Sequence, residues 1–236
     1  MKKTIVLNHK TDLDYENIKY YIDQIKDKIR TDMDIVICPS SIFIPFFNGR
    51  YNFKIGCQNI GGYHATGELS GEELKSMGVS YVIVGHSDRK KYYNEDNRLI
   101  NLKVKECIKN NIIPILCVGE TIEEKELKKT QDVIIKQMRE AFRDVKVDQD
   151  IIIAYEPIWA IGSGITPSVT CIKEIVSMIK NSIYHAHNVN IRVLYGGSIT
   201  EKNIEKLNSI DELDGFLIGK SSTNPDKIIS ILNLID

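Results

Sequence analysis

Eight short apolar segments recur along this chain, and the intervals between them constrain its fold more than any other feature. The segments are Thr4–Leu7, Asp34–Cys38, Phe53–Cys57, Tyr81–Val84, Ile112–Val118, Ile151–Tyr155, Ile191–Tyr195 and Gly215–Ile218. Most of them are continuously apolar rather than alternating, which is typical of strands in a parallel sheet that is covered on both faces. The pattern therefore predicts eight buried, parallel strands.

Helical patterns occupy the intervals between these segments. Isoleucines repeat at helical spacing in two places, at Ile18, Ile22, Ile25 and Ile29 and again at Ile172, Ile175, Ile179 and Ile183. Start signals support further helices: Thr121 opens a capping box, and the pairs Thr166-Pro167 and Asn224-Pro225 each place proline at the first helical position after a capping residue.

Eight strand–helix units leave two main architectures, a closed (β/α)8 barrel and an open doubly wound sheet. The chain has 236 residues, so each unit has about 30 residues and no room remains for a second domain. We predict the α/β class and one domain over residues 1–236, a single (β/α)8 barrel whose eight parallel strands are ringed by helices.

Composition excludes several classes of function. Lys and Arg number 31 against 32 Asp and Glu, a formal net charge of −1, which argues against a nucleic-acid-binding protein. The five cysteines show no CxxC spacing, so neither a disulfide framework nor a zinc site is expected. No apolar run approaches the roughly 18–20 residues that span a bilayer. We expect a soluble cytoplasmic protein with no membrane partner.

Polar residues follow the apolar segments directly, where a (β/α)8 barrel carries its active site. Asn8 and Lys10 follow the first segment, His86 the fourth and Glu156 the sixth, while glycine- and serine-containing loops follow the last three. Each feature alone has a simpler explanation as a solvated loop residue, a helix cap or a tight turn. Their coincidence at one pole of the barrel indicates a site.

These residue types favour one kind of chemistry. A carboxylate can act as a general base, a neutral imidazole can donate to an oxygen that gains negative charge, and an ammonium group stabilises an enediolate or an anionic substrate. Backbone N–H groups in glycine loops bind phosphate, and the loops after strands seven and eight are the recurring phosphate site of this fold. The set predicts proton abstraction beside a carbonyl in a small phosphorylated substrate, without a metal or another cofactor.

Four motifs, in this order, resemble the triosephosphate isomerase family over essentially the whole chain. They are Val84-Gly85-His86-Ser87-Asp88-Arg89, Cys117-Val118-Gly119-Glu120, the stretch Ala154–Gly164, and Tyr195-Gly196-Gly197-Ser198. The resemblance implies that Glu156 is the base, His86 the electrophile that polarises the carbonyl, Lys10 a positive charge, and Asn8 a residue that orients the substrate oxygen.

The resemblance also implies the rest of the site. Backbone groups of Gly162, Ser198 and Gly219 would contact phosphate with Lys220 beside them, and residues 158–166 would form a lid that excludes water. The segment Gly56–Ser70 resembles the family's dimer loop, so a homodimer is expected, with Thr66 reaching the partner's active site near Asn8 and Lys10.

Four positions depart from the family pattern. His9 replaces a tryptophan, and Asp88 replaces a glutamate that contacts the catalytic lysine, which predicts a looser contact. Pro167 restricts the C-terminal hinge of the lid. Lys220 replaces a glycine, so it is expected to resist a glycine-like φ, while its side chain is expected to turn to solvent.

Three functions are compatible with these residues. The first is interconversion of D-glyceraldehyde 3-phosphate and dihydroxyacetone phosphate in glycolysis and gluconeogenesis. The second is isomerisation of a related tetrose phosphate with the same catalytic residues, and the third is a non-catalytic barrel that binds phosphorylated metabolites. Retention of base, electrophile and cation together favours the first.

Overall fold

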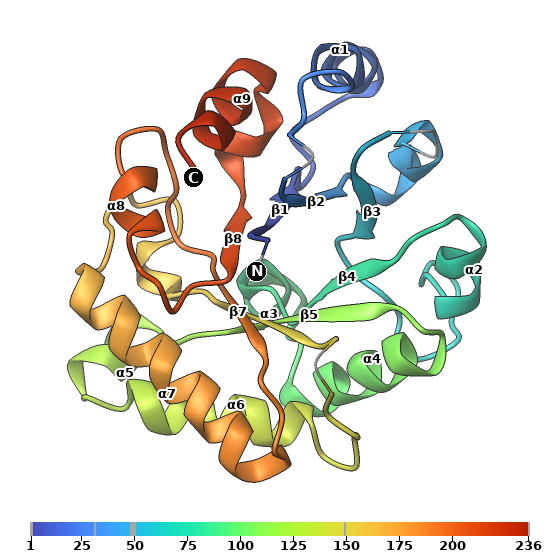
Figure 1. The fold of residues 1–236 in the computed structure, drawn as a ribbon. Coiled ribbons are helices and arrows are strands. Elements are labelled where there is room, and N and C mark those ends of the chain that lie inside the picture. The colour runs from blue at the N-terminus through green and yellow to red at the C-terminus, as the bar shows by residue number, and fades with distance from the viewer. Residues whose placement is uncertain (1, 31, 48–50, 149, 236) are drawn as a thin grey trace.

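The eight strands form a closed parallel barrel in chain order, with β8 hydrogen-bonded back to β1 (Figure 1). The computed structural model describes residues 2–30, 32–47, 51–148 and 150–235. The strands are β1 (Thr4–Asn8), β2 (Asp34–Cys38), β3 (Lys54–Cys57), β4 (Tyr81–Val84), β5 (Ile113–Val118), β6 (Ile152–Tyr155), β7 (Arg192–Tyr195) and β8 (Gly215–Ile218). The predicted (β/α)8 barrel is confirmed, and the open sheet is excluded by closure. The predicted domain, residues 1–236, begins and ends at residues outside those described.

Closure depends on a close approach between the first and last strands. Thr4 pairs with Gly215 and Leu7 with Ile218 in a parallel register. A Cβ at Gly215 would lie 1.8 Å from the Thr4 carbonyl oxygen, and the residue has a φ of +152°. Both observations require glycine at this junction.

Side chains alternate between the barrel interior and the surrounding helices along each strand, as a pleated strand dictates. The interior cluster includes Val6, Ile83, Ile115 and Leu217. Outward neighbours such as Leu7 pack in a larger cluster together with residues of the helices. Because both faces are covered, the strands are apolar without interruption, as the sequence predicted.

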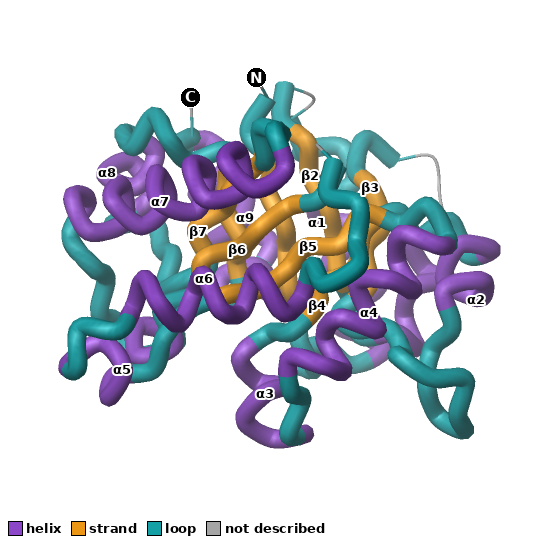
Figure 2. Tube along the Cα trace, turned by 90° about the horizontal axis from the view of Figure 1, so that it is seen from below, coloured by secondary structure: helices purple, strands orange, loops and turns teal. Residues whose placement is uncertain are grey.

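Helices surround the barrel, as Figure 2 shows with strands inside a ring of helices. They are α1 (Tyr15–Ile25), η1 (Ser41–Phe47), α2 (Gly71–Ser76), α3 (Ser87–Tyr93), α4 (Asn97–Lys109), α5 (Ile122–Glu126), α6 (Thr130–Ala141), η2 (Ile158–Ala160), α7 (Val169–His187), α8 (Ile204–Asn208), η3 (Lys220–Thr223) and α9 (Pro225–Asn233). None of the helices in the described part is long and apolar enough to cross a membrane.

Two of the three predicted helix starts are confirmed. Thr121 forms a capping box with Glu124, and Asn224 caps α9 with Pro225 in the first turn. The start at Thr166-Pro167 is wrong, because α7 begins at Val169 and Ser168 caps it by accepting the Cys171 N–H. The Thr166 hydroxyl oxygen instead accepts a hydrogen bond from the Asn203 side chain at 3.0 Å.

Candidate active site

The predicted catalytic residues converge at the C-terminal ends of the strands. Two pockets open there and share Asn8, Lys10, Asp12 and His86. The first, which we name the strand-end pocket, measures about 630 Å³ and is also lined by Glu156 and by the loops after β6, β7 and β8. The second, the side pocket, lies toward the loops after β2, β3 and β4.

His86 and Glu156 face each other across the strand-end pocket. The His86 Nε2 lies 3.2 Å from the Glu156 Oε1. The His86 Nδ1 accepts the Asp88 backbone N–H at 3.1 Å, because His86 is the N-cap of α3. A nitrogen that accepts a hydrogen bond carries no proton, so this contact selects the neutral ring with its proton on Nε2. The helix N-terminus also disfavours positive charge on the imidazole.

Glu156 is a buried carboxylate with a second anchor. Its side chain is 3% exposed, and its Oε2 accepts the Ser87 N–H at 3.3 Å. Small residues surround it: a Cβ at Gly119 would lie 1.8 Å from the Glu156 carbonyl oxygen, and one at Gly196 would lie 2.9 Å from its Cγ. These glycines are required by the close approach, which fixes where the carboxylate lies.

A lysine that sequence reasoning missed lies behind this carboxylate. The Lys90 Nζ donates to the Cys117 carbonyl oxygen at 3.1 Å, at the end of β5. Burial lowers the pKa of Lys90, while the negative charge of nearby Glu156 raises it. The apolar environment of Cys117 and the Glu156 charge raise the pKa of the Cys117 thiol. Lys90 follows the His86 motif directly, but position alone does not distinguish it from an exposed helix lysine.

Lys10 is held in the site by its backbone and by its side chain. Its φ of +50° is unusual for a residue with a side chain. The Gln58 Nε2 donates to the Lys10 carbonyl oxygen at 2.7 Å, and the Asn8 Oδ1 accepts the Lys10 N–H at 3.2 Å. These bonds hold the strained conformation and aim the ammonium group into the pocket.

Asp88 meets the Lys10 ammonium directly, at 2.8 Å from Oδ2 to Nζ. Burial raises the pKa of this carboxyl, but the hydrogen bond from Lys10 and the positive charge of its ammonium group outweigh burial and lower the pKa overall. The shorter side chain was expected to loosen this contact, and that expectation is wrong. The positive φ of Lys10 and the location of Asp88 in the first turn of α3 bring the groups within reach.

The predicted lid, residues 158–166, carries Trp159, the one tryptophan of the sequence, at its second position. Its indole Nε1 donates to the buried Glu120 Oε1 at 2.8 Å, and the Lys125 Nζ lies 3.3 Å from its ring centroid. Farther along, residues 162–165 are exposed, and no heavy atom would lie within 4 Å of a Cβ at Gly162 or Gly164. The tip of the lid therefore stands clear of the barrel and leaves the pocket open.

The predicted phosphate loops line the same pocket. Gly162, Ser198, Gly219 and Lys220 all contribute to its wall. Lys220 begins η3, is exposed and does not have a positive φ, so the replacement of glycine causes no backbone strain. The expected resistance to a glycine-like φ is wrong because the backbone needs no such φ. The Lys220 side chain is exposed, as expected, and it also lines the pocket.

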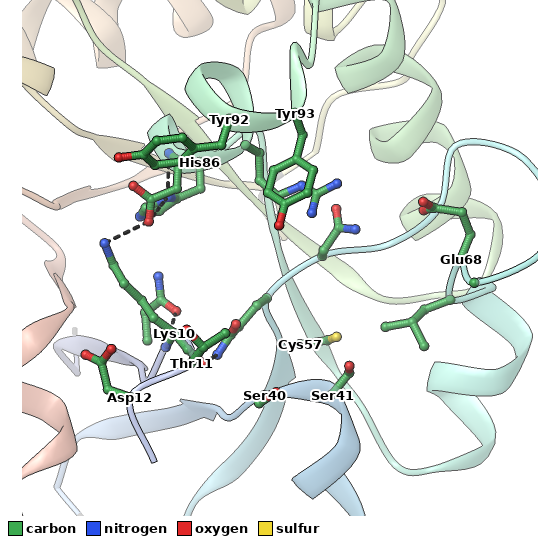
Figure 3. Close-up of a pocket in the computed structure, with 17 residues that line it drawn as sticks. Lys10, Thr11, Asp12, Ser40, Ser41, Cys57, Glu68, His86, Tyr92 and Tyr93 are labelled. Atoms are coloured by element: carbon green, nitrogen blue, oxygen red, sulfur yellow. Dashed lines mark hydrogen bonds and ion pairs between the residues drawn. The ribbon is translucent and has the colours of Figure 1, made fainter. Parts of the chain in front are cut away.

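The side pocket lies beside Lys10 (Figure 3). Lys10, Thr11 and Ser41 lie on one side of it and Tyr92 and Tyr93 on the other. Both tyrosines are 65% exposed. Thr66 lies in the exposed loop of the predicted dimer segment and lines neither pocket, so the chain does not bring it to its own site.

Within the described ranges, no three His, Cys, Asp or Glu side chains come together in a way that could hold a metal ion. Several residues of the site were missed from the sequence. They are Ser87, Gln58, Lys90, Asn203 and Lys227. Their contacts are with backbone groups or loops that the fold alone brings near, so no local pattern marks them.

A family model and several known proteins match this chain over most of its length. A family model described as triosephosphate isomerase matches residues 3–235. A relative named triosephosphate isomerase from Alkaliphilus oremlandii is 38% identical, covering 90% of this chain and 91% of the relative. A second protein of that name, from Mesomycoplasma hyorhinis, is 35% identical and covers 99% of each. A third, from Thermodesulfovibrio yellowstonii, is 40% identical over 74% of this chain and 72% of its own.

Proposed function

Since this chain belongs to the triosephosphate isomerase family, we propose that its strand-end pocket carries out the reaction with the residues that face one another there. The reaction interconverts D-glyceraldehyde 3-phosphate and dihydroxyacetone phosphate, a step of glycolysis and gluconeogenesis. The observation that supports these roles is the 3.2 Å approach of His86 Nε2 to Glu156 Oε1, in a pocket that Lys10 and Asn8 also line.

Glu156 is the base in this proposal. Its carboxylate takes the proton from C1 of dihydroxyacetone phosphate, and the C1–H electron pair forms the C1–C2 double bond of an enediolate. The resulting carboxylic acid returns the proton to C2, while the hydroxyl proton of O1 moves to O2 through the His86 Nε2, which leaves the aldehyde at C1. In the open site the carboxylate is occupied by the Ser87 N–H and by His86. It must leave these partners to reach the substrate carbon, and both distances exceed 3.1 Å, so they are weak anchors.

His86 and Lys10 stabilise the negative charge on the substrate oxygens. The neutral imidazole donates from Nε2 to the carbonyl oxygen as charge develops, because Nδ1 is already an acceptor for the Asp88 N–H. Lys10 adds a fixed positive charge that Asp88 orients. The Asn8 side chain, at the end of β1 beside Lys10, helps to orient the substrate.

The phosphate lies against Gly162, Ser198 and Gly219 in this proposal. The supporting observation is that all three line the pocket together with Lys10, whose Cε would lie 3.8 Å from a Cβ at Gly219. Lys220 and Lys227 line the same wall, and neither side chain has an ion-pair partner among the described residues. They add positive potential at the mouth of the pocket, which favours a dianion.

We further propose that the chain forms a homodimer through the side pocket. The loop that carries Thr66 is exposed, and so are Tyr92 and Tyr93 at the border of the side pocket. The loop and the pocket are both open to solvent in the single chain, so the loop of one copy can pack into the pocket of another. The loop of one protomer would fill the partner's side pocket and bring Thr66 close to Lys10. A stable 27 kDa species in light scattering at micromolar concentration would contradict this.

We also propose that the enzyme is cytoplasmic, that residues 1–236 form a single barrel domain, and that catalysis proceeds without a cofactor. Purified protein should isomerise glyceraldehyde 3-phosphate in an assay coupled to NADH oxidation. A panel of triose and tetrose phosphates then tests the substrate, since a higher kcat/KM for erythrose 4-phosphate would favour the tetrose instead. Folded wild-type protein without turnover of the triose would contradict the proposal.

A further inference from the structure

Asn203 occupies the N-cap position of α8 but does not cap that helix. An asparagine at this position normally accepts a backbone N–H from the first turn of the helix that follows. The Asn203 Oδ1 instead accepts the Thr200 N–H at 2.8 Å, from the loop that precedes α8. This orients the amide away from the helix, and its nitrogen is free to act elsewhere.

The two hydrogens of that nitrogen join two parts of the active site. The Asn203 Nδ2 donates to the Ser198 carbonyl oxygen at 2.9 Å and to the Thr166 Oγ1 at 3.0 Å. Ser198 belongs to the loop after β7 that lines the strand-end pocket. Thr166 is the last residue of the lid segment 158–166. One planar amide therefore ties the end of the lid to the loop that lines the pocket, and we name this arrangement the Asn203 clip.

The clip lies where the lid changes from exposed to packed. The tip makes hydrogen bonds within itself, from the Ser163 Oγ to the Ala160 carbonyl oxygen and from the Ile165 N–H to the Ser163 Oγ. Residues 162–165 are exposed, whereas Thr166 is half-buried and Pro167 is buried. Motion of the tip is therefore expected to pivot close to Thr166, because this residue is anchored while its predecessors are not.

We propose that Asn203 is a positioning residue that couples phosphate binding at the Ser198 loop to the closing of the lid. The proposal rests on the phosphate site under Proposed function. Ser198 lines the pocket at the proposed phosphate site and gives its carbonyl oxygen to the clip, so an adjustment of this loop on binding passes through one side chain to Thr166. Without the clip, the loop still binds phosphate, but the lid no longer responds to it.

Four variants test this coupling. Asn203→Ala removes the whole clip, and Thr166→Val removes the bond to the hinge while keeping the shape of the side chain. The double variant measures whether the two act through each other. Thr170→Val is the matched control, because Thr170 is an exposed threonine in the first turn of α7.

We expect kcat/KM for glyceraldehyde 3-phosphate to fall about fivefold in Thr166→Val and about tenfold in Asn203→Ala, from the loss of one and of several hydrogen bonds. The double variant should match Asn203→Ala, and Thr170→Val should match the wild type. Turnover of unphosphorylated D-glyceraldehyde, which cannot engage Ser198, should stay within about twofold throughout. A residue that only maintained the fold would lower both activities.

Trp159 gives a second, independent readout. As the one tryptophan of the sequence, it lies at the start of the lid and reports its position by fluorescence. Titration of the wild type with inorganic phosphate should change this signal, and Asn203→Ala should bind phosphate with a much smaller change. Multiplicative losses in the double variant, or an unaltered fluorescence response in Asn203→Ala, would overturn the coupling while leaving the phosphate site intact. A wild type that shows neither inhibition by phosphate nor a fluorescence response would refute the phosphate site itself, and the coupling with it.

Discussion

His9 lies between Asn8 and Lys10 and is buried as a neutral imidazole. It is 1% exposed, and its ring lies 4.5 Å from that of Tyr21 in an edge-to-face contact. Burial lowers the pKa of His9 from 6.5 to about 3. A folded-state pKa below the unfolded one means that this group stabilises the fold above pH 6.5 and that the stabilisation is lost as the pH falls toward 3.

The magnitude follows from the difference in pKa. A pH of 4.5 lies about two units below the pKa of the unfolded histidine, which is therefore protonated, whereas the folded histidine is still neutral. Each unit corresponds to about 1.36 kcal/mol, so about 2.7 kcal/mol of stability is lost between pH 8 and pH 4.5. His9→Phe keeps an aromatic ring but cannot titrate. It should therefore lose about 2.7 kcal/mol less than the wild type over this range. At pH 8 it should be at least as stable, because neither ring nitrogen of His9 has a hydrogen-bond partner in the described part of the chain.

Urea unfolding followed by circular dichroism at pH 8 and pH 4.5 measures this difference, with protein concentration held constant so that any dimer contributes equally. His185→Phe is the control, because it makes the same replacement at an exposed position. If the wild type and His9→Phe lost the same stability on acidification, burial would not be what keeps His9 neutral.

Four further changes test other parts of the structure. Glu156→Asp draws the carboxylate back by one methylene and should lower kcat at least a hundredfold with KM little changed, since a displacement of about 1 Å lowers the rate by about this factor. Steady-state kinetics measures this, and a kcat within tenfold of the wild type would show that Glu156 is not the base. Lys103→Met leaves the buried Glu95 with Arg89 alone and should cost about 3–5 kcal/mol of stability in urea unfolding; a loss below 1 kcal/mol would mean that the pair is dispensable. Lys220→Gln should raise KM for glyceraldehyde 3-phosphate by about twofold to threefold at low salt and leave it unchanged at high salt. Lys206→Gln replaces an exposed lysine of α8 and should leave KM unchanged at both salt concentrations. Equal effects of the two substitutions on KM would refute a local role of Lys220. Lys125→Met removes the cation from the Trp159 ring and should favour lid closure, so that KM falls by about twofold to fivefold and the fluorescence shifts; an unchanged KM would show that this contact does not hold the lid.

The barrel and its active pole could be predicted from the sequence because their signals are local. Continuous apolar runs identify buried parallel strands, and each observed strand starts or ends within one residue of its predicted segment. The polar residues that follow each strand must lie at one pole once the strands are parallel. Asn8, Lys10, His86 and Glu156 could therefore be predicted to share one pole of the barrel without any knowledge of their distances.

Other features depended on contacts that chain order does not reveal. A proline after a threonine is a good helix start in isolation, yet Ser168 caps α7, and the Thr166 hydroxyl oxygen accepts from Asn203, 37 residues away in the sequence. Asp88 was expected to reach Lys10 poorly from its length alone. The left-handed backbone of Lys10, supported by Gln58, brings the two groups together at 2.8 Å.

The sequence by itself determined which elements form, in what order, and which residue types gather at their ends, since these depend on periodicity, caps and local composition. Only the tertiary structure decided how those residues meet. The proton of His86 is assigned to Nε2 by a backbone N–H at the start of α3, the Glu156 carboxylate is seated by Ser87 and two glycines, and the lid is tied to the β7 loop by one amide. The contacts of Ser87 with Glu156 and of Asn203 with Thr166 join residues 69 and 37 positions apart, and they exist only once the barrel has closed. The Asp88 N–H lies two residues from His86, and the fold decides only that this ring meets Glu156.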